Sequence, residues 1–279
     1  MPLLSMNAVI AHDLSAKYGE RIALSASTFE VPSQSLGAVI GPNGSGKSTL
    51  LNLIAGLTKP ASGSIEVLGA EPAAARERIA YVLQATTISR TLPISVREVV
   101  TMGRYASTGL TRRLGRADRQ AIDQALERVD LSNVANESLH ELSGGQRQRV
   151  LVAQGLAQDH ELLLLDEPLI GVDLGSSASI EASLSEDVGR GKTVLVTTHD
   201  LGQAMMADWV ILLAGMVVAY GSPSAVLTEE NLARAYGLRV VRSGDRFVVD
   251  DPAHQGADGV HVHLDRSIHL ETPGTDLHR

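Results

Sequence analysis

The stretch from Gly41 to Thr49 constrains the fold most, and it reads Gly-Pro-Asn-Gly-Ser-Gly-Lys-Ser-Thr. It follows an apolar run at 36–40 and precedes a helical pattern at 50–55 that stops at Gly56. A strand, a glycine-rich turn and a helix N-terminus direct backbone N–H groups and the positive end of a helix dipole to one spot. The sequence therefore predicts a phosphate-binding loop within an α/β fold.

The residue types within this loop indicate a nucleoside triphosphate. Glycines let the backbone wrap around phosphates without a clash at Cβ. The Lys47 ammonium can reach the β- and γ-phosphates, and the Ser48 hydroxyl can bind Mg²⁺. The residues predicted to bind nucleotide are Gly41, Pro42, Asn43, Gly44, Ser45, Gly46, Lys47, Ser48 and Thr49.

Composition limits the other classes of function. The chain has 279 residues, enough to bury a full core as one large domain or two modest ones. A net charge of −8 and an aromatic content of 3% argue against a large nucleic-acid surface. The absence of cysteine excludes disulfides and thiolate metal sites.

No membrane span or signal peptide is expected. The longest apolar stretch, 209–220, is interrupted by Gly215 and is shorter than the roughly 20 residues of a membrane helix, so we expect a β-hairpin there. Residues 1–6 lack the start of a signal-peptide pattern. If the chain works at a membrane, another subunit has to anchor it.

Two carboxylates follow a run of four leucines at 162–165, which predicts a central parallel strand buried on both faces. Ligands of parallel sheets bind at the carboxyl ends of strands. We expect Asp166 to hold Mg²⁺, directly or through water, and Glu167 to accept a proton from a water that attacks the γ-phosphate. His199 follows the next apolar strand, at 193–198, and could bind the γ-phosphate, orient that water or be structural.

The segment 142–149 reads Leu-Ser-Gly-Gly-Gln-Arg-Gln-Arg and predicts a second anion-binding helix end. Ser143 is a good N-cap, and the two glycines expose backbone N–H groups. One nucleotide would rarely need both helix ends from a single copy. Two copies arranged head-to-tail could instead hold each nucleotide between the loop of one and the Ser143 segment of the other.

Elsewhere the pattern changes from strands to helices and back. Strands are predicted at 8–12, 22–29, 62–69 and 79–83, a helix at 95–102, and a further helix capped by Asp118. Four basic residues lie in this helical region, and a solvated face is the preferred interpretation: Arg112, Arg113, Arg116 and Arg119. Tyr18 could stack on a base or pack a hairpin edge, and Gln84 could contact a metal or an attacking water or be a polar loop residue.

Taken together, residues 8–237 resemble an ATP-binding cassette (ABC) ATPase. Three contiguous motifs carry the resemblance: the Walker A motif at 41–49, the signature at 142–146, and the Walker B motif at 162–166 followed by Glu167. Four single residues also match: Gln84 in the Q-loop position, Asp173 in the D-loop position, His199 in the switch position, and Tyr18 in the position of the adenine-stacking aromatic. The resemblance implies an α/β P-loop NTPase (RecA-like) core with an antiparallel β subdomain and a helical, ABC-specific subdomain. The implied ATPase domain covers 1–240, with the helical subdomain at about 86–150, and 241–279 form a C-terminal tail with a small hairpin followed by a disordered segment.

The resemblance also implies cofactors, partners and roles. A homodimer would close on two ATP and two Mg²⁺, with Ser143 and the amides of the following glycines acting across the interface. Gln84 would sense the metal and pass strain to the helical subdomain, which docks on an integral membrane permease. The residues implied in catalysis are Lys47, Gln84, Ser143, Gly145, Glu167, Asp173 and His199, and those implied to hold Mg²⁺ are Ser48, Gln84 and Asp166.

A finer resemblance is to the ATPases of bacterial zinc/manganese-type metal importers, carried by 101–105, 162–173 and 227–237. It implies a place on the cytoplasmic face of the cell membrane, a solute-binding protein acting through the permease, and no nucleic-acid partner. Siderophore and cobalamin importers share much of this pattern, and a soluble ABC ATPase acting on nucleic acid or ribosomes is a more distant alternative. The histidines beyond Pro252 suggest either a metal-sensing tail or a hydrophilic disordered end.

Overall fold

The computed structural model describes residues 7–83, 93–108, 113–237, 239–243 and 246–250. Its centre is a six-stranded sheet in the order β5-β6-β7-β3-β8-β9, in which β9 alone runs antiparallel to its neighbour. The strands are β3 (Leu36–Ile40), β5 (Ile79–Val82), β6 (Leu162–Leu165), β7 (Thr193–Thr198), β8 (Trp209–Leu213) and β9 (Val217–Gly221). This arrangement confirms the predicted parallel core and the hairpin expected at 209–220.

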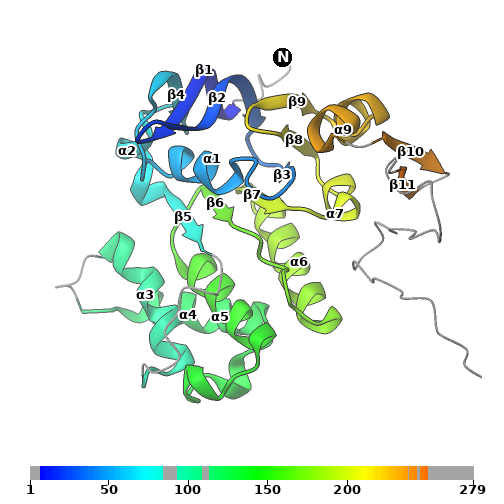
Figure 1. Cartoon of the computed structure of the whole chain (residues 1–279). Coiled ribbons are helices and arrows are strands. Elements are labelled where there is room, and N and C mark those ends of the chain that lie inside the picture. The colour runs from blue at the N-terminus through cyan, green and yellow to red at the C-terminus, as the bar shows by residue number, and fades with distance from the viewer. Residues whose placement is uncertain (1–6, 84–92, 109–112, 238, 244–245, 251–279) are drawn as a thin grey trace, which may run out of the picture.

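The four leucines of β6 show why the sheet is buried on both faces. In the orientation of Figure 1, Leu163 and Leu165 belong to the core shared with the helices below the sheet, whereas Leu162 and Leu164 belong to the core above it. Successive side chains of a strand point to opposite faces, so a continuous apolar run suits a strand covered on both sides.

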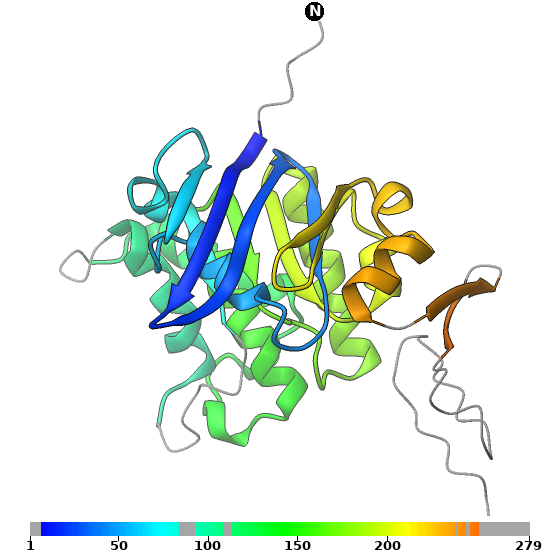
Figure 2. The same ribbon diagram turned by 45° about the horizontal axis from the view of Figure 1, so that its top comes forward.

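A second, antiparallel sheet has the order β2-β1-β4 and covers the upper face. It consists of β1 (Asn7–Tyr18), β2 (Arg21–Pro32) and β4 (Ser62–Val67). Helix α1 (Lys47–Ile54) shares one apolar core with both sheets, and Figure 2 shows β1, β2 and β4 in front of it. The sequence underestimates β1 and β2, because their exposed polar residues interrupt the apolar pattern while the backbone ladder continues.

The helices that follow α1 have these bounds: α2 (Pro72–Ala75), α3 (Val96–Thr108), α4 (Arg116–Arg128), α5 (Gly144–Ala157), α6 (Leu174–Gly189), α7 (Leu201–Met205), α8 (Pro223–Val226) and α9 (Glu229–Tyr236). Within the described ranges, single 3₁₀ turns lie at Arg76–Arg78, Ser132–Val134 and Leu139–Glu141. Among the described residues, no helix combines the length and apolar character needed to cross a membrane.

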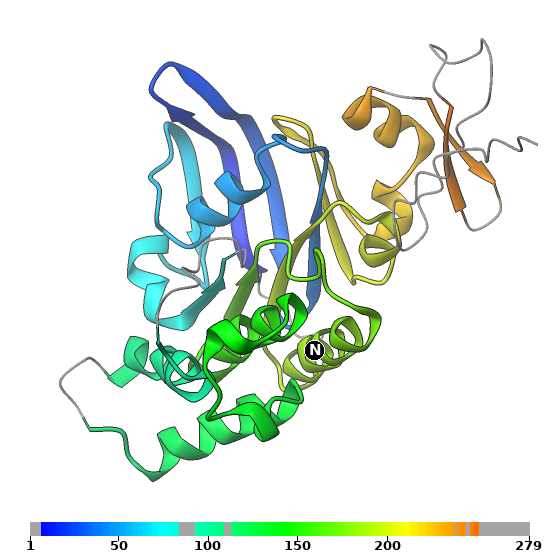
Figure 3. The same cartoon turned by 60° about the horizontal axis from the view of Figure 1, so that its bottom comes forward.

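Helices α3, α4 and α5 gather below the parallel sheet, on the side away from β1, β2 and β4 (Figure 1). Seen from below, α4, α5 and α6 lie in front of the sheet (Figure 3). Helix α3 approaches α5 so closely that a Cβ on Gly103 would lie 2.2 Å from the carbonyl oxygen of Gln154. The helical region predicted from the sequence is therefore packed against the core sheet.

The expected cap of α4 is wrong by three residues. Gly115 is the N-cap, and Asp118 is the third helical residue. The Asp118 carboxylate accepts the N–H of Gly115 at 2.8 Å and binds the guanidinium of Arg104 at 3.0 Å. A carboxylate that reaches back to the N-cap amide satisfies a helix-terminal donor as well as an N-cap side chain does. For this reason an acidic residue near the start of a helix can belong to the N-cap or to the third helical position.

The chain closes on the other edge of the sheet. Helices α7, α8 and α9 share an apolar core with β3 and β8. Beyond them, β10 (Arg239–Ser243) and β11 (Arg246–Asp250) pair antiparallel at the position of the predicted hairpin. The histidines beyond Pro252 lie outside the described residues.

Candidate active site

The loop between β3 and α1 has the shape that the sequence predicts for a phosphate cradle. Gly44 and Gly46 have φ of 78° and 104°, values that favour glycine. A Cβ on Gly41 would lie 2.0 Å from the carbonyl oxygen of Leu213. These positions therefore require glycine for backbone reasons, and they leave the N–H groups of the loop at the N-terminus of α1, where an anion is favoured.

Lys47 is held inside this loop. Its Nζ donates to the carbonyl oxygens of Gly41 at 2.9 Å and Pro42 at 3.3 Å, and it lies 3.6 Å from Oε1 of Glu167. Only 6% of the side chain is exposed. The ammonium group is thus fixed at the mouth of the loop, between backbone acceptors and one carboxylate.

The loop also contains a buried hydroxyl that fits a phosphate ligand. Ser45 is 5% exposed, and its Oγ has no hydrogen-bond partner within the described part of the chain. Buried polar atoms are normally hydrogen-bonded, so an orphan in a glycine loop points to an absent ligand. The carbonyl of Ser45 is itself held by the N–H of Gly215 at 2.9 Å.

Asp166 and Glu167 follow β6 at the same edge of the sheet, as predicted. The N–H of Asp166 donates to the carbonyl of Val82 at 2.9 Å. Glu167 has φ of 50°, a left-handed conformation that is uncommon for a residue with a side chain. Its contact with Lys47 joins the two motifs, which are 120 residues apart in the chain. The Asp166 carboxylate and the exposed Ser48 hydroxyl are the hard oxygen ligands that Mg²⁺ takes, so the donor set fits this ion.

Ser143 caps α5 as predicted. Its hydroxyl accepts the N–H of Gln146 at 3.2 Å, and Oε1 of Gln146 accepts the N–H of Ser143 at 2.8 Å. This reciprocal pair fixes the first turn of the helix. Figure 1 shows α5 among the helices below the parallel sheet and α1 above it, so the two helix N-termini belong to different parts of one molecule.

Asp173 and Gly145 lie together. Asp173 is the N-cap of α6, and a Cβ on Gly145 would lie 2.7 Å from its Oδ2. Hydrogen bonds from the N–H and hydroxyl of Ser176 lower the pKa of the Asp173 carboxyl. A negative carboxylate therefore sits beside the glycine of the α5 terminus.

The remaining predicted residues are placed less tightly. His199 is exposed immediately after β7. Tyr18 ends β1 with half of its surface exposed. Gln84, expected to contact the metal, lies outside the described residues, as does Arg112 of the basic group.

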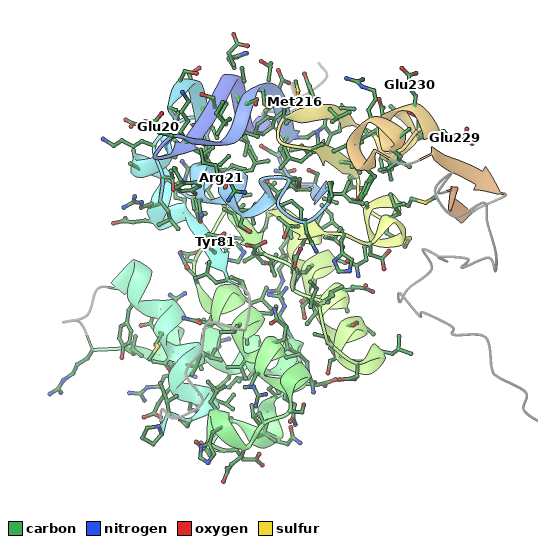
Figure 4. All side chains as sticks on the ribbon, viewed as in Figure 1. Glu20, Arg21, Tyr81, Met216, Glu229 and Glu230 are labelled. Atoms are coloured by element: carbon green, nitrogen blue, oxygen red, sulfur yellow. The ribbon has the colours of Figure 1, made fainter. Side chains whose placement is uncertain are left out.

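Two residues near the carboxylates escaped the sequence analysis. Thr197 of β7 donates to Asp166 Oδ1 at 2.7 Å and accepts the N–H of Glu167 at 2.8 Å. Tyr81 of β5, labelled in Figure 4, has its pKa raised by burial and further by the charges of Asp166 and Tyr18. Both look like ordinary strand residues in the sequence, so no local pattern there indicates their contacts with the carboxylates.

The chain matches a family model described as "ABC transporter" over residues 24–170. It is 38% identical to the manganese transport system ATP-binding protein MntB of Bacillus subtilis, covering 85% of this chain and 96% of that protein. It is 41% identical to the zinc transport system ATP-binding protein TroB of Treponema pallidum, covering 84% and 88%.

Solved structures give the same picture. A metal-chelate type ABC transporter in an inward-facing conformation superposes with a TM-score of 0.74 at 30% identity, covering 88% of this chain and 98% of that one. A dimeric ATP-binding cassette in a post-hydrolysis state, bound to ADP and Pi, superposes with a TM-score of 0.68 at 29% identity, covering 77% and 98%.

Proposed function

The chain belongs to the ABC transporter family of ATPases, and from this premise we propose that it powers import of a divalent metal cation of the manganese or zinc class. Members of the family hydrolyse ATP and couple the reaction to transport. The observation that carries the ATPase part of the proposal is the 3.6 Å contact between Lys47 Nζ and Glu167 Oε1, and the substrate class rests on the relatives. The contact brings the loop after β3 and the carboxylates after β6 to one place.

The chemistry follows from the groups at this edge of the sheet. The N–H groups of the loop and the Lys47 ammonium bind the phosphates of ATP. Ser48 and Asp166, with Gln84 as a further predicted ligand, would hold Mg²⁺, which when bound neutralises phosphate charge. Glu167 accepts a proton from the attacking water, and His199 orients that water or the γ-phosphate.

Two copies of the chain form the working unit in this proposal. Helix α5 begins at Gly144, and its N-cap residue Ser143 is exposed, so an anion can approach the N-terminus of this helix. Within one chain this terminus and the phosphate loop belong to different parts of the fold (Figure 1). A head-to-tail pair would bring the Ser143 terminus of one copy to the nucleotide of the other, and the dimeric arrangement of a solved cassette supports this assembly.

The names of the relatives support the substrate class. Manganese and zinc transport are stated for proteins 38% and 41% identical to this chain. A siderophore or cobalamin importer is the less favoured alternative, and a soluble ATPase acting on nucleic acid or ribosomes is less favoured still. In the proposal the chain lies on the cytoplasmic face of the cell membrane, bound to a permease that receives metal from a solute-binding protein.

Replacement of Lys47 tests the proposal. Lys47→Ala removes a charge-assisted phosphate contact, so we expect ATP affinity to fall at least about ten-fold, because such bonds are roughly twice as strong as neutral ones. Calorimetric titration of ATP into the full-length wild type and variant measures this change. Arg116→Ala, an exposed change in α4, is the control and should bind ATP normally.

Transport is measured in cells of the source organism. Cells that carry Lys47→Ala in place of the wild type should lose uptake of radiolabelled manganese or zinc. Uptake of both metals at the wild-type rate would contradict metal import. Loss of ferric siderophore or cobalamin uptake instead would favour the alternative importer.

A further inference from the structure

We propose that Thr197 is a positioning residue for ATP hydrolysis, whose single hydroxyl sets the orientation of both Asp166 and Glu167. The inference rests on the proposed ATPase function and goes beyond it, because none of the family motifs named above includes Thr197. Thr197 lies on β7, which pairs directly with β6, and its side chain is 1% exposed.

The hydrogen-bond directions are dictated by the groups involved. The backbone N–H of Glu167 can only donate, so the Thr197 oxygen accepts it, at 2.8 Å. The hydroxyl proton is then given to the carboxylate of Asp166, at 2.7 Å. The result is a chain from the Glu167 amide through the Thr197 hydroxyl to Asp166 Oδ1, in which each bond polarises the next.

The Glu167 end of this chain matters because of the backbone conformation there. Glu167 has φ of 50°, and the backbone of a residue other than glycine stays in this region when the surrounding structure holds it there. The Thr197 hydroxyl is a buried acceptor for the amide of that same residue. It therefore helps to hold the turn that aims the Glu167 carboxylate toward Lys47.

The Asp166 end fixes which oxygen remains for the metal. Oδ1 accepts the Thr197 hydroxyl, so this bond restrains the carboxylate and leaves Oδ2 as the oxygen that Thr197 does not engage. Thr197 pairs with Val39 of β3, the strand that leads into the phosphate loop. One hydroxyl thus ties the carboxylates to the strand beside the loop.

The test compares Thr197→Val, Thr197→Ser and Thr193→Val in the full-length chain. Valine keeps the shape of threonine and removes the hydroxyl, and serine restores it. Thr193 is the matched control: it lies on the same strand, is 2% exposed, and its hydroxyl accepts a backbone N–H from Gln34 at 3.0 Å, with no hydrogen bond to a carboxylate of the described residues.

We expect Thr197→Val to lower kcat by between about ten- and a hundred-fold with little change in KM for ATP, because displaced catalytic groups cost rate more than binding. Thr197→Ser and Thr193→Val should keep most of the wild-type kcat. Amide hydrogen exchange without nucleotide gives a readout independent of activity: the Glu167 amide should exchange faster in Thr197→Val than in the wild type or in Thr197→Ser.

A Thr197→Val variant with wild-type kcat would overturn the inference, as would unchanged exchange of its Glu167 amide or equal losses of kcat in Thr197→Val and Thr197→Ser. An equal loss in Thr193→Val would also overturn it, since the effect would then follow from any buried hydroxyl of β7. A wild-type chain that binds no ATP contradicts the proposed function. A wild type that hydrolyses ATP beside a fully active Thr197→Val contradicts only this inference.

Discussion

Lys47 and Glu167 show how much of the site is preformed at the scale of single residues. Both are oriented by backbone groups: two loop carbonyls hold the ammonium, and the left-handed turn after β6 aims the carboxylate. Their contact at 3.6 Å places a cation and a candidate base at one point. Preorganised charges of this kind need little rearrangement when the substrate binds.

Replacing Glu167 by glutamine separates binding from chemistry. Glu167→Gln keeps the size of the side chain and removes its ability to take a proton, so ATP binding should persist while kcat falls by about 10²- to 10⁴-fold. Glu161→Gln is the control, since Glu161 precedes β6 and forms an exposed ion pair with Arg78. Steady-state ATPase assays and nucleotide titration measure the two effects, and a Glu167→Gln variant with wild-type turnover would show that another group is the base.

At the scale of elements, the crossing of α3 and α5 depends on small residues. Gly103 of α3 faces the backbone of α5, and Gly155 of α5 faces the β-sheet, where an added Cβ would lie 2.6 Å from Val82 Cγ2. A flexible side chain can move away from such a contact, but a backbone carbonyl cannot. Gly103 therefore permits the close approach of α3 to α5, and Gly155 that of α5 to the sheet, although helix propensity disfavours glycine at both positions.

Gly103→Ala tests this crossing. The added methyl group meets the carbonyl of Gln154, so we expect a loss of at least about 2 kcal/mol in the free energy of unfolding. Gly189→Ala, at the end of α6, meets nothing within 4 Å and should be neutral or stabilising by up to about 1 kcal/mol. Chemical denaturation of both variants makes the comparison, and equal stabilities would rule out the close approach.

At the scale of the whole molecule, a buried polar network ties the helices below the sheet to the core. The Asp187 carboxylate of α6 accepts from Arg128 of α4 at 2.7 Å and lies 2.9 Å from Nε2 of His160, just before β6. Burial raises the pKa of Asp187, but the hydrogen bond and charge of His160, with those of Arg128, outweigh it and the pKa is lowered. Three segments far apart in the sequence are joined at one carboxylate.

The pH dependence of unfolding reports on this network. A carboxyl with a lowered pKa stabilises the fold fully above its ordinary pKa of about 4, and that stability is lost as the pH falls through the folded value. Asp187→Asn should cost about 3–5 kcal/mol at pH 7, because the buried guanidinium of Arg128 keeps its charge and loses the carboxylate that pairs with it, and less in strong acid. Asp123→Asn breaks the exposed pair with Arg97 and should cost less than about 1 kcal/mol. Denaturation at both pH values measures this, and a pH-independent cost would contradict the network.

The apolar strands of the parallel sheet, and the positions along the chain of the glycine loop and the carboxylates, could be predicted from the sequence because the signals there are local. A glycine loop between an apolar run and a helix, or two carboxylates after four leucines, encodes its structure in adjacent residues. The cap of α4 was misassigned, because Gly115 carries no side-chain signal and the carboxylate of Asp118 acts from the third helical position. The lengths of β1 and β2 were underestimated for a similar reason, since the ladder continues through polar residues.

By itself, the sequence determined that a phosphate loop and a pair of carboxylates lie at the carboxyl edge of a parallel sheet, because apolar runs, glycines and acids occur at fixed local spacing. Only the tertiary structure decided that Thr197 bridges Asp166 and Glu167, and that Asp187 gathers Arg128 and His160. These contacts join residues from different strands and helices. Their partners are chosen by strand order and helix packing, which no local pattern of residues specifies.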